Sequence, residues 1–257
     1  IDVAGSNDTI NVSEGRYNGS LSISNKFLTI KGDNATNTFI HSTNSPVVYI
    51  SGPASVEFSD VGIVGGNWIV FPPWEYFSPR IKRGVVATNS ADVILSNVDL
   101  NNVVNYYHTQ YGGTLVANNI NIDNRNDTTG QTDVGFSLRS CYARINNLQQ
   151  NKGRIDHTID INNDLPVTHV DAIVENSTIR ANGSSYGDCI RTFSESDVTV
   201  SNCYLYSPAG QDPTGGTAVG INGPSNSVHI INNVLDKIPW GIYVYGSITN
   251  SNNITVE

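Results

Sequence analysis

The chain has 257 residues, 38% of them hydrophobic and only 14% charged, and its formal net charge is −9. This composition excludes a disordered chain, and the acidic balance excludes a nucleic-acid partner because phosphate binding needs a basic face. No apolar run is long enough to cross a bilayer, so we expect no membrane span.

The first residues and the glycosylation motifs indicate a secreted protein. The chain begins at Ile1 without a signal peptide, as expected of a processed secreted protein or of a trimmed chain. Asn-x-Ser/Thr motifs are frequent, although an asparagine-rich chain also produces them by chance. The candidate glycosylation sites are Asn7, Asn11, Asn18, Asn34, Asn126, Asn176, Asn182 and Asn253. We expect an extracellular or cell-surface location.

An internal repeat organises the chain. In one unit, Val93 and Leu95 stand four and two positions before Asn97, and Val98 and Leu100 stand one and three positions after it. Period two predicts a strand with one buried face, and the change of phase at the asparagine predicts a sharp corner. Asn and Asp tolerate the left-handed backbone that such a corner requires. The predicted corner residues are Asp60, Asn97, Asn119, Asn147, Asn176, Asn202 and Asn232.

The spacing of the corners predicts a solenoid with loops of unequal length. Successive corners lie 37, 22, 28, 29, 26 and 30 residues apart, and a further short strand precedes most of them. The sequence therefore predicts one all-β domain over residues 1–257, a single-stranded right-handed parallel β-helix. We expect about eight to ten coils with three short strands per coil.

This pattern resembles the pectin-lyase-like superfamily of right-handed parallel β-helices. The aligned asparagines resemble the internal asparagine ladder of that superfamily, in which buried amides bond to neighbouring coils. The opening segment from Asp8 to Gly19, followed by Leu28-Thr-Ile-Lys-Gly-Asp, resembles the first coils of secreted members. Among these, the chain is most similar to repeat-bearing surface proteins of methanogenic archaea. The resemblance implies a fold and no particular activity, because the repeat encodes only stacking.

The longest insertion, residues 65–83, is a loop rich in aromatic and basic residues. Exposed aromatics stack on sugars or anchor protein interfaces, and the cations can bind uronate carboxylates. The loop can equally fold over its own wall with the aromatics packed inward. The candidate glycan- or partner-binding residues are Trp68, Phe71, Trp74, Tyr76, Phe77, Arg80, Lys82 and Arg83.

Acidic residues and histidines are densest between residues 152 and 171. A lyase needs a cation or base and often calcium held by carboxylates, and this segment could supply them. The alternative is a solvated polar wall, which is normal for a β-helix. The candidates are Asp156, His157, Asp160, Asp164, His169 and Asp171, with Lys82 from the insertion as a possible base.

The segment from Gly187 to Ile190 resembles half of the polygalacturonase signature, in which paired aspartates protonate the leaving group and activate water. Asp188 matches one of these acids, but Cys189 stands where the second is required. The glycine-flanked histidine of that family is missing as well, so coincidence is the alternative. We expect no cofactor and no dedicated metal, apart from a possible Ca²⁺.

Three cysteines cannot all pair within one chain. Cys189 and Cys203 can form a disulfide that leaves Cys141 free or intermolecular, or all three can be buried thiols.

Neither end of the chain has a covering helix or tail, and strand edges left open favour end-to-end pairing. A fragment with its caps removed would look the same.

Three functions follow from these observations. The first is an extracellular structural protein of a sheath, surface layer or adhesin that self-associates into a homopolymer, preferred because no complete catalytic set is visible. The second is a secreted polysaccharide lyase or glycoside hydrolase acting on uronic-acid polymers. The third is a glycan-binding module without catalysis.

Overall fold

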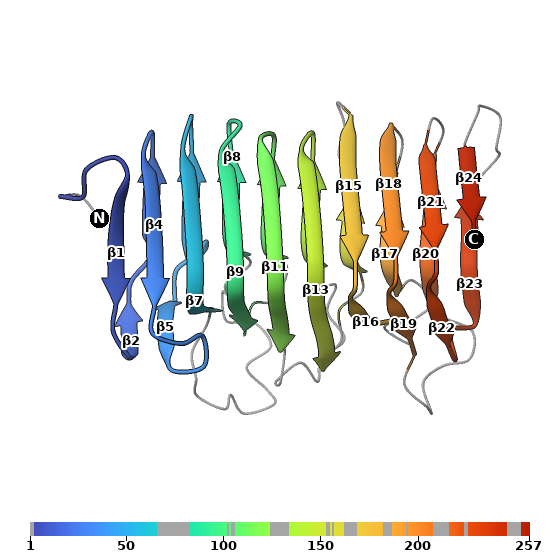
Figure 1. Cartoon of the computed structure of the whole chain (residues 1–257), viewed down its shortest axis with the longest axis horizontal. Coiled ribbons are helices and arrows are strands. Elements are labelled where there is room, and N and C mark those ends of the chain that lie inside the picture. Colours follow the sequence, from blue (N-terminus) through green and yellow to red (C-terminus); the bar gives the residue numbers. More distant parts are fainter. Residues whose placement is uncertain are drawn as a thin grey trace.

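The computed structural model describes residues 3–65, 83–101, 103, 106–123, 134–152, 155, 157–161, 169–181, 187–193, 195–207, 216–223, 226–245 and 253–257. Within these residues the chain forms strands and no helix, and Figure 1 shows successive coils placed side by side along one long axis. The strands form two parallel sheets. The predicted parallel β-helix is confirmed.

The first sheet follows the corners of the repeat. Its main path is β1 (Asp8–Val12), β4 (Phe27–Gly32), β7 (Ser55–Gly65), β9 (Asp92–Asn101), β11 (Thr114–Asp123), β13 (Tyr142–Lys152), β15 (Val170–Glu175), β18 (Ser196–Ser201), β21 (Ser227–Ile231) and β24 (Asn253–Val256). Beside this path lie β2 (Gly15–Asn18), β5 (Thr38–Ser42), β16 (Thr178–Arg180), β19 (Tyr204–Tyr206) and β22 (Val234–Asp236).

The second sheet closes the other side of the coils. Its order is β23 (Trp240–Tyr245), β20 (Thr217–Asn222), β17 (Asp188–Thr192), β14 (His157–Ile161), β12 (Val134–Arg139), β10 (Tyr106–Tyr111), β8 (Arg83–Thr88), β6 (Val48–Ser51) and β3 (Leu21–Ser24). The ten strands of the main path in the first sheet agree with the predicted number of coils.

The corner geometry explains how the apolar residues before and after each corner face the same core. In β9, Val93, Leu95, Val98 and Leu100 are buried, while Asn97 between them is exposed with a φ of 55°. A left-handed residue reverses the alternation, so the apolar side chains on both sides of the corner face the same axis. All seven predicted corner residues have φ between 52° and 56°.

The asparagine column lies outside the coil, which corrects the expected internal ladder. Asn97 donates from Nδ2 to Asp60 Oδ1 at 3.0 Å, Asn119 donates to Asn97 at 2.9 Å, and Asn147 donates to Asn119 at 2.8 Å. Asn176 instead donates to Oδ1 of Asn146 at 2.9 Å. The turn directs these amides toward solvent, because the buried positions on either side are taken by apolar residues.

The apolar column also holds the cysteines. Cys141, Cys189 and Cys203 are free and buried, so the alternative of three buried thiols is found and the disulfide between Cys189 and Cys203 is not. Burial raises the pKa of Cys141 to about 12, which keeps the thiol protonated and unreactive at neutral pH.

Several predicted features fall outside the described residues. These are most of the insertion, including Trp68, Phe71, Trp74, Tyr76, Phe77, Arg80 and Lys82, together with Asp156, Asp164, Asn126 and Asn182. The other six glycosylation candidates, Asn7, Asn11, Asn18, Asn34, Asn176 and Asn253, are exposed. The described residues contain no helix long and apolar enough to cross a membrane.

Candidate functional site

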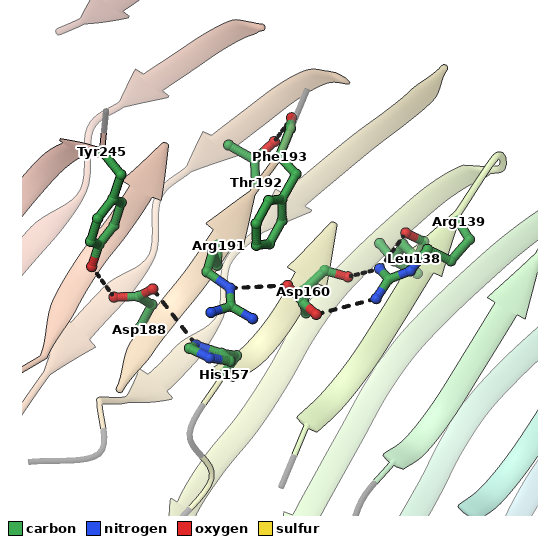
Figure 2. A network of polar contacts seen from close by, with 9 residues as sticks. All are labelled: Leu138, Arg139, His157, Asp160, Asp188, Arg191, Thr192, Phe193 and Tyr245. Carbon is green, nitrogen blue, oxygen red and sulfur yellow. Dashed lines mark hydrogen bonds and ion pairs between the residues drawn. The ribbon is translucent and has the colours of Figure 1, made fainter. Parts of the chain in front are cut away.

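A network of charged side chains covers the outer face of the second sheet where β12, β14, β17 and β23 lie (Figure 2). Ile159 and Ile161 of β14 belong to the apolar core, so Asp160 between them faces outward. Asp160 pairs in register with Arg191 of the next coil, and His157 pairs with Asp188. The stacking of coils thus places chemically different residues side by side on one wall.

One half of the network is built around Asp160. Arg139 donates from Nη2 to Asp160 Oδ2 at 3.2 Å and from Nη1 to the Asp160 carbonyl oxygen at 3.0 Å. Arg191 donates from Nε to Oδ1 of the same carboxylate at 3.2 Å. Asp160 and Arg139 are buried, whereas the Arg191 side chain is 20% exposed. Two guanidinium groups therefore hold one carboxylate, and Arg191 retains N–H groups that can face solvent or a ligand.

The other half is built around Asp188. Its Oδ2 lies 3.6 Å from His157 Nδ1, and its Oδ1 accepts a 3.4 Å hydrogen bond from the Tyr245 hydroxyl. The distance to His157 is too long for a hydrogen bond, and His157 Nδ1 is buried without a hydrogen-bond partner. The Tyr245 hydroxyl also lies 3.3 Å from Thr217 Oγ1. Asp188 is buried and Tyr245 is partly exposed, so Tyr245 is the member of this group nearest to solvent.

Gly220 makes the contact between Asp188 and Tyr245 possible. It lies on β20, between the strands of the two residues. A Cβ atom at this position would lie 3.0 Å from Asp188 Oδ2 and 3.0 Å from Tyr245 Cε2. A side chain here would therefore crowd both residues and disturb their contact.

Burial shifts the proton affinities of this half in opposite directions. Desolvation raises the pKa of Asp188 from 3.8 to about 6, against smaller opposing effects from the Thr217 hydrogen bond and the Arg191 charge. Desolvation, helped by the Arg191 charge, lowers the pKa of His157 from 6.5 to about 4. Desolvation also raises the pKa of Tyr245. Between about pH 4 and pH 6, Asp188 is protonated and His157 is neutral.

This arrangement can deliver a proton to a ligand. When Asp188 is protonated, its O–H can donate to the Tyr245 oxygen, which leaves the phenolic proton free for an acceptor outside the wall. A carboxyl group whose pKa is raised by burial is the usual source of a general acid near neutral pH.

The structure brings together three of the predicted candidates, His157, Asp160 and Asp188, and places the described Asp171 elsewhere. His157 and Asp188 meet across neighbouring coils, whereas Asp171 lies on β15 of the first sheet. The predicted acid and histidine cluster is therefore divided between two walls. Arg83 begins β8 of the second sheet.

Sequence analysis missed Arg139, Arg191 and Tyr245. Each lies on a different coil, and the segments between them have unequal lengths. A short strand was expected before most corners, so the available signal was an outward position on that strand, but the sequence does not show which outward residues of different coils face one another.

Asp171 belongs to a separate, exposed group. His169 Nε2 lies 3.0 Å from Asp171 Oδ1 and 3.3 Å from Asp197 Oδ2, and the three ligand atoms lie within 4.8 Å of one another. Mixed nitrogen and oxygen donors suit a transition metal better than Ca²⁺. Exposed acidic groups of this kind are common without any ion, and nothing else at this place points to a ligand.

Solved structures share this fold, although no protein-family model and no curated protein sequence matches the chain. An alginate lyase from Paenibacillus sp. str. FPU-7 aligns over 97% of this chain and 94% of its own, with a TM-score of 0.55 and 13% identity. The Geobacillus virus E2 protein ORF18 aligns over 99% of this chain but 56% of its own, with a TM-score of 0.55 and 11% identity. At these identities the likeness establishes the fold alone.

Proposed function

We propose that the chain is a secreted enzyme that cleaves uronic-acid polymers by acid–base chemistry. The observation that carries the proposal is the buried Asp188, with its raised pKa, hydrogen-bonded to the partly exposed Tyr245. A buried acid that serves only packing needs no such path toward solvent, and titratable groups perturbed by both burial and specific partners concentrate at functional sites.

Arg191 supplies the recognition of an acidic sugar. Its side chain is the partly exposed cation of the network, and Asp160 holds its Nε from behind. Guanidinium groups bind carboxylates through paired N–H donors. In this arrangement the uronate carboxylate faces Arg191 and the neighbouring glycosidic oxygen faces Tyr245.

The proton step is common to hydrolysis and elimination. As the glycosidic C–O bond breaks, its electron pair goes to the leaving oxygen, which takes the phenolic proton of Tyr245. Asp188 then returns a proton to Tyr245. Tyr245 contacts the substrate in this scheme, and Asp188 acts through it.

The reaction class is decided by what happens on the other side of the bond. In a lyase, a base removes the proton next to the carboxylate and leaves a double bond in the sugar. In a hydrolase, an activated water adds to the anomeric carbon. One of the aligned structures is an alginate lyase, and alginate is a polymer of uronic acids, so such polymers are the first to test.

The test is incubation of the purified chain with alginate and polygalacturonate between about pH 3 and pH 8, a range that spans the pKa values of His157, about 4, and Asp188, about 6. New reducing ends without ultraviolet absorbance identify a hydrolase, and reducing ends with the absorbance of an unsaturated sugar identify a lyase. Absence of cleavage of both polymers, and of other acidic polysaccharides, contradicts the proposal.

The structural cell-envelope role remains a second candidate. Val234 and Leu235 on β22 and Val256 on β24 have exposed apolar side chains, and exposed apolar surface can pair with another copy. Sedimentation velocity over a range of concentrations tests this role, and a monomer throughout contradicts it. Glycan binding without turnover would instead select the third candidate, a binding module.

A further inference from the structure

The outer face of β23 carries three aromatic residues in a row. Trp240 is 47% exposed and Tyr243 is 37% exposed, while Tyr245 is partly exposed. The ring centroids of Trp240 and Tyr243 lie 5.1 Å apart with an interplanar angle of 86°. Those of Tyr243 and Tyr245 lie 4.6 Å apart at 74°. Each ring therefore packs edge-on against its neighbour, which fixes the orientation of all three.

This row is continuous with the acid–base network. Tyr245 is its last member, and its hydroxyl reaches Asp188 (Figure 2). β23 and β17 are separated by two strand spacings, about 10 Å, and this distance exceeds the width of one sugar ring. A chain bound at Arg191 and Tyr245 would continue over Tyr243 and Trp240.

The strand between these residues offers only small side chains next to the network. Thr217 pairs with Trp240 and with Asp188, and Gly220 pairs with Tyr243 and with Arg191. No large side chain of β20 at these positions separates the aromatic row from Arg191. The Arg191 guanidinium also lies 4.8 Å from the ring centroid of Phe193, two positions further along the chain, so an aromatic ring contacts the cation as well.

We propose that Trp240 and Tyr243 form a stacking subsite for the sugar residues of an acidic polysaccharide that is bound at Arg191 and Tyr245. The inference rests on the proposed function, and it names the binding surface that this function uses. The C–H face of a pyranose ring is apolar and its rim is polar. Rigid aromatic rings beside hydroxyl groups match that surface at low entropic cost.

The occupant follows from charge and continuity. A polyuronate can pair one of its carboxylates with the partly exposed Arg191, a contact that the aromatic row by itself does not offer to an apolar partner. The row also leads directly to the groups that would act on the ligand. A neutral glucan would lack the contact with Arg191 and should bind more weakly.

Binding is measured by calorimetry with oligomers of mannuronate and of galacturonate in the Asp188→Asn background, which separates binding from turnover. Trp240→Ala and Tyr243→Ala should each weaken binding at least about tenfold. Trp240→Phe keeps a ring and should recover most of the affinity. Tyr49→Ala is the matched control, because Tyr49 is 36% exposed on the same sheet but lies on β6.

The outcomes separate this inference from the proposed function. Unchanged affinity in Trp240→Ala and Tyr243→Ala overturns the subsite, even if the wild-type chain cleaves the polymer. Binding that needs Trp240 in a chain that cleaves no polymer supports the subsite and contradicts the enzyme. Loss of a dimer in Trp240→Ala, with no effect on oligosaccharide binding, shows that a second copy occupies the row and overturns the subsite.

Discussion

Tyr245 on β23 donates a hydrogen bond to Asp188 on β17, across the intervening strand β20, at a distance of 3.4 Å. The two residues are 57 positions apart in the chain. Their contact exists because stacked coils bring equivalent positions together and because Gly220 leaves the space between them open. The proposed proton transfer depends on this one hydrogen bond.

Removal of the phenolic oxygen should abolish proton delivery and leave the fold intact. In Tyr245→Phe the ring still packs against Tyr243, so we expect an unfolding free energy close to that of the wild type. Activity on a uronate polymer should fall by about 100-fold or more, the usual size of a general-acid contribution. Reducing-end assays beside denaturant unfolding check this. Wild-type turnover in Tyr245→Phe would refute the proton path.

The pH dependence of activity should follow Asp188 and His157. Because Asp188 must be protonated, kcat/KM should fall as the pH rises through about 6, and protonation of His157 should reduce it below about pH 4. Asp188→Asn should lower the rate and remove the fall near pH 6. If kcat/KM of the variant still falls near pH 6, another group is responsible for that fall.

Asp188 and two buried histidines should change the unfolding free energy in opposite directions as the pH rises. The folded state holds a proton on Asp188 that the unfolded state releases above pH 3.8, so Asp188 lowers stability as the pH rises to about 6. His157 and the buried His108, both with a pKa of about 4, raise stability over the same range, because the unfolded chain protonates them first.

Asp188→Asn removes the one group of these three that lowers stability as the pH rises. We expect the unfolding free energy of the variant to rise more steeply between about pH 4 and pH 6, by on the order of 3 kcal/mol. Urea unfolding at several pH values measures the slope. Glu57→Gln on the first sheet is the control for loss of one acid from the wall, and equal slopes in the two variants would contradict the assignment.

Filling the space at Gly220 should separate Asp188 from Tyr245. The new Cβ of Gly220→Ala would lie 3.0 Å from side-chain atoms of both residues, so they must shift by a few tenths of an ångström. A displacement of this kind can cost up to about 100-fold in rate, with a loss of stability of about 1–3 kcal/mol from overpacking. Gly241→Ala is the matched control, since its nearest neighbour is Leu235 Cδ1 at 3.4 Å. Equal rates in both variants would show that the hydrogen bond between Asp188 and Tyr245 is dispensable.

The outer asparagine column should contribute mainly through its backbone conformation. Asn119 has a φ of 56°, and alanine in that region costs about 1–2 kcal/mol. Asn119→Gly keeps the conformation accessible and loses only exposed amide hydrogen bonds. We therefore expect Asn119→Ala to destabilise the chain more than Asn119→Gly in denaturant unfolding. The reverse order would show that the amide column, rather than the corner, carries the stability.

The coils and their corners could be predicted from the amino-acid sequence alone. Apolar residues around Asn97 had to face one axis, and only a left-handed corner allows this, so a local pattern decided the fold. The pattern did not decide on which side the amides project, because the same spacing suits an inner or an outer ladder. Burial of the neighbouring apolar residues settled this in favour of the outer side.

The candidate site, in contrast, depends on how the coils stack on one another. His157, Asp188 and Tyr245 come from three coils, and the loops between them differ in length, so sequence separation carries no information about their contact. Register between stacked strands placed them together, while it sent the nearby Asp171 to the opposite sheet. The raised pKa of Asp188 likewise depends on desolvation by the assembled wall, a property that no single coil possesses.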